Sequence, residues 1–448
     1  MRPIKTYLKN IERSASIAKH FPENLDRPVE LWPQKRVALY QEDAIKEILA
    51  HTYRNNSFYR KKWDQESVSP DTFQSIKDIA KFPFTFKDEL RGKPWILLSV
   101  PKEEVSQIHM STGTTSKSLG DHTYTLYSWE DIYVNELAIE LPLLVHCLPE
   151  DCVINALPYE MSSAGMAFHR SFQNGSGAAV VNVGKGGFYS DPKKTLLVMK
   201  DLEASVLITT PSYAMSLWET AQRLRLDIQN DFQLKYIWLT GEGCSPAFRK
   251  RLEKVWQRPC LMYYGSLECG PLGIECRFQE GYHIPEGHVL VEIVDPETGK
   301  PLPPGCVGEI CVTVLYRKAA PLIRYRVGDL AYLDTETCTC CIERPRLFLS
   351  GREQDQIKIG DKSYSPYFLE EILYRIPEMG NTYQFLVSPD GLSVRLELMH
   401  EYSETEKRQI ATKIKNQLMH YVPDILDVSI EANMERTFGK AERVRVIS

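Results

Sequence analysis

The sequence has few of the features that mark membrane, secreted or nucleic-acid-binding proteins. No apolar run in its 448 residues reaches the roughly 18 residues that a membrane-spanning helix needs. The N-terminal segment MRPIKTYLKNIERSASIAKHF lacks the apolar stretch of a signal peptide. Positive charge is not in excess, because 54 Lys and Arg face 59 Asp and Glu, which argues against a basic nucleic-acid surface. We therefore expect a cytoplasmic protein that binds neither membranes nor nucleic acid.

The cysteines are scattered, and their number, 11, is odd, so a disulfide framework is not indicated. We expect reduced thiols, although Cys338, Cys340 and Cys341 form a cluster that needs its own explanation. Internal repeats and low-complexity segments are also missing from the sequence. With 43% hydrophobic residues, the chain is long enough for two or three domains with substantial cores.

The phosphate-binding pattern G-x-x-x-x-G-K-[ST] is absent as well, but another polar loop is present. Residues 111–117 read STGTTSK, so Ser, Thr and Gly fill every position except that of Lys117. Hydroxyl and backbone N–H groups donate hydrogen bonds, glycine permits close approach, and lysine adds positive charge. This composition suits a polyphosphate, but a solvated turn has the same composition.

Apolar, β-branched runs alternate with segments of helical length in the middle of the chain. This alternation predicts β-α-β crossovers and an α/β fold with a mostly parallel sheet, whose ligands bind at the carboxyl ends of the strands. The expected strands are 152–158, 178–184, 205–210, 234–242 and 261–265, and the expected helices lie around 161–174, 191–202, 211–225 and 245–257.

The pattern changes twice after this α/β region. Residues 288–315 predict a β-hairpin, because two apolar runs flank a turn rich in Pro, Gly and Asp. Beyond Arg352, five short segments indicate a small α+β domain: 357–359, 366–376, 382–400, 403–419 and 424–431. We expect four parts in all: a variable N-terminal extension (1–39), a large domain with a β-hairpin or barrel region (40–351), a hinge (352–355) and a small C-terminal domain (356–448).

Residues suited to a nucleotide lie at the end of one expected strand or on turns. Tyr264 and Gly265 end an expected strand, where the ring could stack on a base, and the carboxylate of Glu268 could hold Mg²⁺. Asp329 lies on a tight glycine turn and could accept both hydroxyls of a ribose. An ordinary strand exit and a turn aspartate that caps the backbone are the alternatives.

Two more segments near the end of the chain can each be interpreted as functional or as ordinary connecting chain. The polar run from Gly351 to Lys358 suits an interdomain hinge, but a plain linker has the same composition. Lys440 lies beside Gly439, a pattern that is also typical of a solvated tail.

Taken together and in this order, these segments resemble the AMP-forming adenylating enzymes, most closely their phenylacetate-CoA ligase branch. The likeness runs from about residue 40 to the end of the chain. It is carried by FYRKKWDQESVSPDTFQSIKDIAKFPFTFKDELR (58–91), TPSYAMSLWETAQ (210–222), GYHIPEGHVLVEIVDPETGKPLPPGCVGEI (281–310), APLIRYRVGDL (320–330) and GREQDQIKIGDKSYSPYFLEEIL (351–373).

The resemblance implies a two-step reaction: a carboxylate attacks the α-phosphate of MgATP to give acyl-AMP and pyrophosphate, and a thiol then displaces AMP to give a thioester. Carboxylate and triphosphate repel each other, so catalysis depends on positioning and on cations. The implied roles are β- and γ-phosphate binding for Ser111, Thr112, Gly113, Thr114, Thr115 and Lys117; Mg²⁺ binding for Glu268; adenine contact for Tyr264 and Gly265; ribose or phosphate contact for Asp329 and Arg352; and adenylation for Lys440.

In the family the small C-terminal domain is mobile and swings between the two steps. Lys440 then serves adenylation, and the opposite face near Lys358 and Gly360 serves thioester formation. The chain departs from the family pattern at Gln354, where the hinge usually has Asp. It also departs in the phosphate loop, where Ser116 and Ser118 replace the usual Gly and Pro.

The resemblance also suggests a metal site. Some phenylacetate-CoA-ligase-like proteins carry metal ligands at the positions of Cys276 and His283, and a C-x-C pair, here Cys338 and Cys340, supplies two more. Four S and N ligands suit a tetrahedral structural Zn²⁺. Cys341 could ligate in place of Cys340, and four unlinked side chains are the alternative.

The acyl pocket is expected to be lined by residues 159–166 and 267–274 and by the segment Gly241, Glu242 and Gly243. This last segment, here called the seam, is expected to separate the acyl pocket from the adenine site. The apolar side chains of the pocket suit an aryl or arylacetic acid, and a hydroxylated or amino-substituted acid stays open. The residues expected to line it are Tyr159, Ser163, Ala164, Gly165, Gly270 and Pro271.

Three functions fit these features. The first is an acyl-CoA ligase that uses ATP, Mg²⁺ and coenzyme A. The second is a stand-alone adenylation enzyme that loads the phosphopantetheine of an acyl carrier protein. The third is a non-catalytic nucleotide-binding descendant, which the presence of Lys440 argues against because binding alone does not require it. Relatives in this branch are often dimers, so a homodimer is also open.

Overall fold

The computed structural model describes residues 32–111, 122–137, 147–173, 177–187, 190–340, 342, 344–432, 434 and 443–447. The phosphate-loop residues from Thr112 to Lys117, Lys440 and Cys341 therefore lie outside the described residues. The helices are α2 (Gln34–Asn55), α3 (Ser57–Gln65), α4 (Lys87–Leu90), α5 (Trp129–Leu137), α6 (Ala164–Ser171), α7 (Pro192–Asp201), α8 (Pro211–Arg223), α9 (Pro246–Trp256), α10 (Pro366–Tyr374) and α11 (Glu404–Met419), with 3₁₀ turns at Pro70–Thr72, Ile76–Lys81 and Lys102–Glu104.

Within the described residues, a sheet of 11 strands runs through the large part of the molecule in the order β10-β11-β12-β13-β9-β8-β7-β6-β5-β3-β4. Its strands are β3 (Cys152–Ala156), β4 (Ala179–Asn182), β5 (Val206–Thr209), β6 (Tyr236–Leu239), β7 (Cys260–Ser266), β8 (Gly270–Glu275), β9 (Tyr282–His283), β10 (Val289–Val294), β11 (Gly308–Val314), β12 (Tyr325–Asp334) and β13 (Arg346–Arg352). A separate pair is formed by β1 (Val105–Met110) and β2 (Tyr124–Ser128).

The half of the sheet from β4 to β7 is parallel, which confirms the α/β alternation predicted from the sequence. Three of its helices, α7, α8 and α9, begin where a capping side chain is followed by proline. Asp191, Thr210 and Ser245 each accept a hydrogen bond from the backbone three residues on, and proline starts α7, α8 and α9. A side-chain acceptor satisfies an otherwise free N–H group, and proline at the first helical position has none to satisfy.

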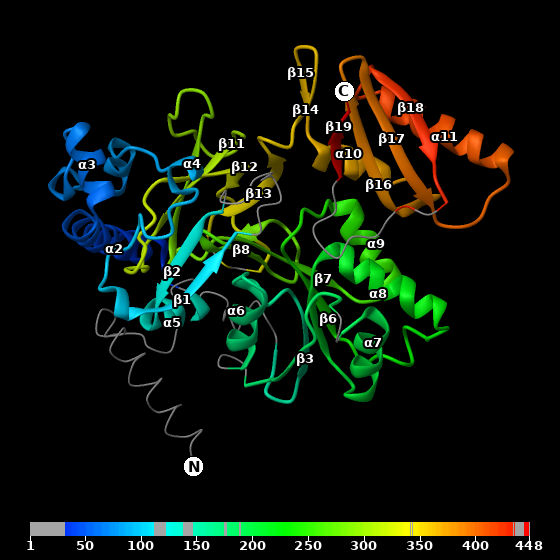
Figure 1. Ribbon diagram of the computed structural model, residues 1–448, viewed down its shortest axis with the longest axis horizontal. Helices are drawn as coiled ribbons and strands as arrows, with labels where there is room; N and C mark the ends of the chain where they lie inside the picture. The colour runs from blue at the N-terminus through cyan, green and yellow to red at the C-terminus, as the bar shows by residue number, and fades with distance from the viewer. Residues whose placement is uncertain are drawn as a thin grey trace.

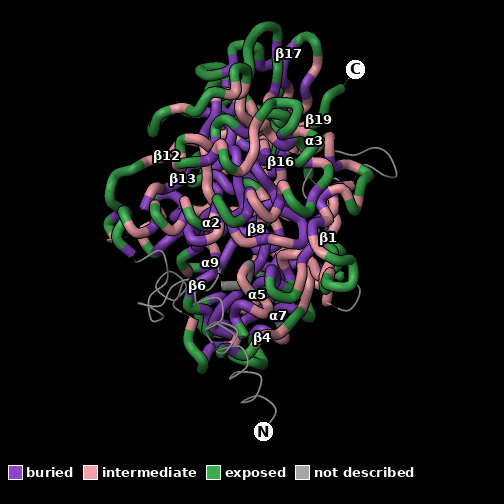
Figure 2. Tube along the Cα trace, turned by 90° about the vertical axis from the view of Figure 1, so that its left-hand side faces the viewer, coloured by how far each residue is buried: buried purple, intermediate pink, exposed green. Residues whose placement is uncertain are grey.

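The other half of the sheet, from β7 to β10, is antiparallel, so the whole sheet is mixed. The hairpin predicted over 288–315 is present as β10 and β11. Apolar residues of β5 and β6, among them Leu207, Ile237 and Leu239, are fully buried. Buried residues run through the middle of the molecule around β8, and the exposed residues gather on the outer turns (Figure 2).

The last part of the chain forms a smaller lobe, drawn in orange to red in Figure 1. It contains the hairpin of β14 (Ile357–Ile359) and β15 (Lys362–Tyr364), then α10, α11 and a four-stranded sheet ordered β18-β17-β16-β19. These strands are β16 (Met379–Ser388), β17 (Gly391–Leu398), β18 (Ile425–Ile430) and β19 (Val444–Val446). The segment expected over 382–400 thus holds most of β16 and all of β17.

Helix α2 runs across residue 40, the expected start of the large domain, and Val37 and Ile45 of this helix are buried. The side chain of Arg344 donates to Gln34 Oε1 at 2.6 Å, which ties the start of α2 to the segment before β13. Among the helices that the structure describes, none combines the length and the apolar character needed to cross a membrane.

Candidate functional site

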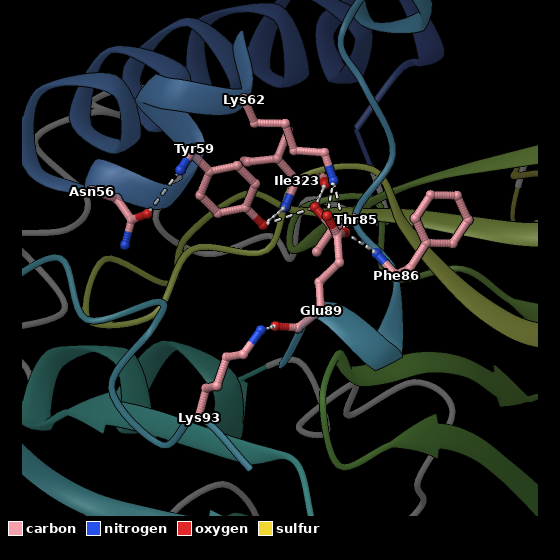
Figure 3. Close-up of polar contacts among 8 residues, drawn as sticks. All are labelled: Asn56, Tyr59, Lys62, Thr85, Phe86, Glu89, Lys93 and Ile323. Carbon is pink, nitrogen blue, oxygen red and sulfur yellow. Dashed lines mark hydrogen bonds and ion pairs between the residues drawn. The ribbon is translucent and has the colours of Figure 1, made fainter. Parts of the chain in front are cut away.

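The segment that precedes the phosphate loop in sequence is fixed to the main sheet by a buried group of hydrogen bonds (Figure 3). Thr85 Oγ1 donates to the carbonyl of Ile323 at 2.7 Å and lies 3.1 Å from the hydroxyl of Tyr59. That hydroxyl also accepts from the backbone N–H of Ile323 at 3.1 Å. Tyr59 and Thr85 have no exposed surface, so these hydrogen bonds are shielded from water.

Glu89 then shapes the short helix α4 that follows Thr85 (Figure 3). Its carboxylate accepts from the backbone N–H of Phe86 at 2.8 Å and pairs with Lys62 at 2.6 Å. Lys87, between Phe86 and Glu89, reaches across to Glu268 with an Nζ–Oε1 distance of 3.2 Å. Sequence reasoning gave Lys87 no role, because nothing local shows that its partner lies far along the chain.

Glu268 is a buried carboxylate that stays charged. Thr123 Oγ1 donates to Glu268 Oε1 at 2.7 Å. Burial acts to raise the pKa of Glu268, but the positive charge of Lys87 and the Thr123 hydrogen bond outweigh it, so the pKa is lowered. The backbone carbonyl of Thr123 also accepts a hydrogen bond from the backbone N–H of Ser111 at 2.9 Å. Glu268 therefore lies beside the start of the predicted phosphate loop.

Tyr264, Asp329 and Arg352 form one hydrogen-bonded group. The Tyr264 hydroxyl donates to Asp329 Oδ2 at 2.6 Å, and Arg352 Nε donates to Asp329 Oδ1 at 2.9 Å. The pairing of β12 with β13 places Asp329 opposite Arg352. Burial, and then the charge of Asp329, raise the pKa of Tyr264, so the phenol stays protonated as a donor. The sequence predicts Asp329 on a glycine turn, but in the structure it lies within β12, where Gly328 before it has a φ of 83°, a conformation that favours glycine.

The predicted seam is built on a second buried ion pair. Lys185 Nζ lies 2.7 Å from Glu242 Oε1, and the Ser212 hydroxyl donates to the same oxygen at 2.8 Å. Although burial acts to raise it, the pKa of Glu242 is lowered by Lys185 and, to a smaller extent, by Arg443. Gly241 beside it has a φ of 81°, which a side chain would disfavour. Lys185 is another residue that sequence reasoning missed.

Among the predicted pocket residues, Tyr159 has a fixed orientation. Its hydroxyl contacts Asn155 Nδ2 at 2.7 Å and the side chain of Asn182, so the ring is tied to β3 and β4. Ser163 and Ala164 begin α6, and both are half-buried. At Gly165 a Cβ atom would lie 2.6 Å from the carbonyl of Pro158, so only glycine fits there.

Gly265 and Gly270 serve a close approach of β7 and β8. A Cβ on Gly265 would lie 2.6 Å from the carbonyl of Gly270, and Pro271 opposite is buried. These residues set the spacing of the two strands that carry Tyr264 and lead into Glu268.

Ser163 also borders a cavity of about 10 Å³ that sequence reasoning did not anticipate. Its polar side chains come from β1, β2 and α6 and include His109 and Tyr127. Burial, and then the charge of Arg170, lower the pKa of His109 to about 4, so this histidine is neutral near pH 7. A larger cavity of about 350 Å³, lined by residues such as Trp218 and Val255 on α8 and α9, includes no predicted site residue.

Four candidate metal ligands meet at one point. The side-chain atoms of Cys276, His283, Cys338 and Cys340 lie within 4.8 Å of one another. The sulfur atoms of Cys276 and Cys338 are 3.7 Å apart, and Cys340 Sγ is 3.4 Å from His283 Nε2. Burial, and then the charge of Arg346, lower the pKa of His283 to about 4, which leaves the neutral imidazole that a metal needs.

Lys358 and Gly243 complete the set of predicted residues within the described ranges. Lys358 is exposed on β14, and in the described part of the chain it shares no hydrogen bond or ion pair with the residues above. Gly243 is exposed and faces the ring of Tyr367, which a Cβ atom would approach to 4.0 Å. The structure thus places Ser111 near Glu268, through Thr123, and Tyr264 beside Asp329 and Arg352, and leaves Lys358 outside both groups.

Comparison with known proteins gives consistent matches. A family model described as AMP-binding enzyme matches residues 122–314. A phenylacetate-coenzyme A ligase of Thermus thermophilus is 33% identical over 86% of this chain and 86% of its own length. One of Escherichia coli K12 is 30% identical over 93% of this chain and 96% of its own. Among solved structures, a 2-hydroxyisobutyryl-CoA ligase in the postadenylation state has a TM-score of 0.84 at 19% identity, covering 94% of this chain and 91% of that one.

Proposed function

Because the chain belongs to the AMP-binding enzymes, in the branch of the phenylacetate-coenzyme A ligases, we propose that it joins a small aryl or arylacetic acid to coenzyme A at the expense of ATP. The observation that carries this proposal is the group of Tyr264, Asp329 and Arg352 beside the charged Glu268. It offers an aromatic face, a carboxylate for two hydroxyls and a cation within one wall, which is what an adenosine phosphate requires.

In the first step, an oxygen of the substrate carboxylate attacks the α-phosphorus of ATP. The new P–O bond forms as the bond to the oxygen bridging the α- and β-phosphates breaks, and pyrophosphate leaves with the electron pair. Asp329 holds the ribose and Tyr264 the adenine, while Arg352 and Lys440 supply positive charge near the phosphates. The acyl group lies between α6 and the seam, near Ser163.

In the second step, the thiol of coenzyme A gives up its proton and its sulfur attacks the carbonyl carbon of acyl-AMP. The C–S bond forms as the C–O bond to AMP breaks, and AMP leaves with the electron pair. The exposed Lys358 on β14 belongs to the face expected to serve this step. The same division of labour supports the proposed hinge 352–355 and a mobile part 356–448, whereas the proposed boundary between 1–39 and 40–351 falls within α2.

Two metal ions fit the chain. Glu268 suits Mg²⁺, because this ion is commonly held by one or two carboxylates together with substrate phosphates, whose charge it neutralises. The cluster of Cys276, His283, Cys338 and Cys340 suits Zn²⁺. Ligands about 2.3 Å from a tetrahedral ion lie roughly 3.8 Å apart, and the observed separations of 3.4 and 3.7 Å fit that spacing.

The experiment that tests the proposal is acid-dependent exchange of labelled pyrophosphate into ATP. A panel of benzoic, phenylacetic, hydroxyl- and amino-substituted aromatic acids and short aliphatic acids is compared. We expect exchange only when an acid is present, with the aromatic acids most active. Exchange without acid contradicts acid activation, and exchange confined to aliphatic acids contradicts the substrate class.

The alternative acceptor, a carrier-protein phosphopantetheine, is tested with the acid that gives the fastest exchange. Thioester formation with free coenzyme A supports the ligase, and transfer only to a holo carrier protein supports the stand-alone adenylation enzyme. Cytoplasmic location and a homodimer remain expectations.

The Lys440→Ala variant tests the proposed catalytic role of Lys440. We expect it to lower exchange by at least about a hundredfold, since it removes charge stabilisation of the transition state, and to leave ATP binding nearly unchanged. Unchanged exchange in this variant contradicts the adenylation role of Lys440.

A further inference from the structure

Helix α9 of the large part is the main platform for the small C-terminal lobe (Figure 1). Phe248 on α9 stacks on Tyr374 of α10, with ring centroids 4.4 Å apart and an interplanar angle of 7°. Arg251, one turn further along α9, donates to the carbonyl of Ile376 at 2.9 Å and to that of Gly380 at 3.0 Å. These contacts hold α10 and the start of β16 against the large part.

The first turn of α9 receives carboxylates from the C-terminal lobe. Glu370 Oε1 accepts from the backbone N–H of Ser245 at 2.8 Å, and Glu371 Oε2 accepts from that of Ala247 at 2.6 Å. The N–H groups of a first helical turn have no partner within their own helix, and negative charge is stabilised there. Here the partners come from residues more than a hundred positions further along the chain.

Arg443 joins this contact from the other side of the C-terminal lobe. Its guanidinium pairs with Glu370, and its Nη1 donates to the hydroxyl of Tyr383 at 3.0 Å. The Tyr383 hydroxyl in turn donates to Glu370 Oε2 at 2.5 Å. The guanidinium also lies over the ring of Phe248 on α9, 5.4 Å from its centroid.

Arg443 is at the same time connected to the predicted active centre. Its charge contributes to the lowered pKa of Glu242, which belongs to the seam between the adenine and acyl sites. The backbone carbonyl of Arg443 accepts from Phe385 N at 2.8 Å, so the chain just before β19 is anchored in the lobe. Arg443 lies three positions after Lys440 in the sequence.

We propose that Arg443 is a positioning residue for the first half-reaction. By binding Glu370 and Tyr383 of the lobe and the face of Phe248 on α9, it holds the lobe against the large part near Glu242 while the acyl-AMP forms. This inference rests on the proposed function and deepens it, because it assigns a contact that serves adenylation only.

The contact serves only the first half-reaction because its two sides belong to different parts of the molecule. Glu370, Glu371 and Tyr383 belong to the lobe, whereas Ser245, Ala247, Phe248 and Glu242 belong to the large part. A swing of the lobe separates the two groups, so the contact cannot support the thioester step. Loss of Arg443 should therefore affect the two half-reactions unequally.

The test compares Arg443→Gln with Arg395→Gln, a control that removes an Arg–Glu pair lying entirely within the lobe. Arg395 pairs with Glu431 at 2.5 Å and takes no part in the contact with α9. Pyrophosphate exchange is measured with phenylacetate, or with the most active acid of the panel, and thioester formation is measured from the matching preformed acyl-adenylate and coenzyme A. We expect Arg443→Gln to lower the rate of exchange by roughly tenfold or more, which is the size of effect that misplaced reacting groups produce. The rate of thioester formation should stay within about twofold of that of the unaltered protein. Arg395→Gln should leave both steps unchanged.

A double variant, Glu370→Gln with Arg443→Gln, removes the carboxylate that would otherwise stay buried without its cation. We expect the same split between the steps in the double variant as in Arg443→Gln alone, because both residues act through one contact. The positioning role is overturned if Arg443→Gln and the double variant slow both half-reactions equally, or if neither variant slows exchange. Absence of exchange in the unaltered protein with every acid overturns the proposed function itself, which distinguishes the two failures.

Discussion

Among single residues, Asp329 carries the most specific part of the proposed nucleotide site. Each of its two oxygens already has one donor, Tyr264 on one side and Arg352 on the other. A carboxylate oxygen can accept more than one hydrogen bond, so both oxygens retain room for ribose hydroxyls. The two neighbours fix the orientation of the carboxylate before the nucleotide arrives.

Asp329→Asn is therefore expected to weaken ATP binding. The change removes the negative charge that Arg352 and the ribose hydroxyls share, and a hydrogen bond to a charged group contributes about 1.5–3 kcal/mol. We expect the KM for ATP to rise by at least about tenfold. The measurement is initial rate against ATP concentration.

The matched control is Asp334→Asn on the same strand. Asp334 faces Arg346 across the β12–β13 pair, as Asp329 faces Arg352, and its carboxylate lies 2.6 Å from Arg346 Nη2. This control should leave the KM for ATP unchanged. An equal rise in both variants would show that the effect comes from a weakened strand pair and not from the nucleotide.

The limits of sequence reasoning are clearest at this scale. Tyr264, Glu268 and Asp329 stand out in the sequence because each has a side chain of obvious chemistry at an expected strand end or turn, although the structure places Tyr264 within β7 and Asp329 within β12. Lys87 and Lys185 could not. Each is a single lysine in a polar stretch, and its importance comes from a buried carboxylate 181 or 57 positions away in the sequence.

At the scale of elements, the cluster of Cys276, His283, Cys338 and Cys340 joins the end of β8 and the strand β9 to the loop before β13. These strands are neighbours in the sheet, but β9 has only two residues and pairs with β13 at only two positions. So short a strand provides little pairing of its own. A bound ion would supply the missing connection.

Cys338→Ser is expected to lower bound zinc from about one ion per chain to a small fraction of that, since losing one of four ligands weakens a tetrahedral site strongly. The melting temperature should fall with it. Metal content by mass spectrometry and thermal unfolding are the measurements. Cys306→Ser, at an exposed cysteine outside the cluster, is the control. Unchanged metal content in Cys338→Ser would contradict the site.

Arg324 is a second link between elements, because it connects β12 to the segment before Thr85. Its guanidinium binds Glu292 through two hydrogen bonds of 3.0 Å and the carbonyl of Phe82 at 2.7 Å. Arg324 is 2% exposed. The pair therefore lies in the interior, where removal of one partner leaves the other charge without compensation.

Arg324→Leu is expected to lower the free energy of unfolding by about 3–5 kcal/mol, measured by urea denaturation. The half-exposed pair of Arg395 and Glu431 offers the comparison, and Arg395→Leu should cost less than about 1 kcal/mol. Similar losses in the two variants would show that burial of the Arg324 pair does not matter.

At the scale of the whole molecule, the sequence predicted the parallel half of the sheet better than the antiparallel half. The parallel half follows from local alternation of strands and helices, and the starts of α7, α8 and α9 are marked by capping residues followed by proline. In the antiparallel half, β9 pairs with β13, although 62 residues lie between the last residue of β9 and the first residue of β13. No local pattern specifies such a pairing, which depends on the packing of the complete sheet.

The small lobe shows the same division. Its segments were predictable from apolar periodicity, but its attachment to α9 through Glu370, Glu371 and Arg443 was not, because those residues resemble ordinary surface charges in the sequence. The position of the lobe is set by contacts between distant residues and not by the pattern within each part.

The measurement that tests the central claim most directly is the stoichiometry of products when the protein is given MgATP, coenzyme A and an aromatic acid such as phenylacetate. We expect AMP, pyrophosphate and the aryl- or arylacetyl-CoA thioester to form in equal amounts, and none of them to form without the acid. Release of ADP and phosphate, or AMP formation that does not depend on the acid, would contradict this claim.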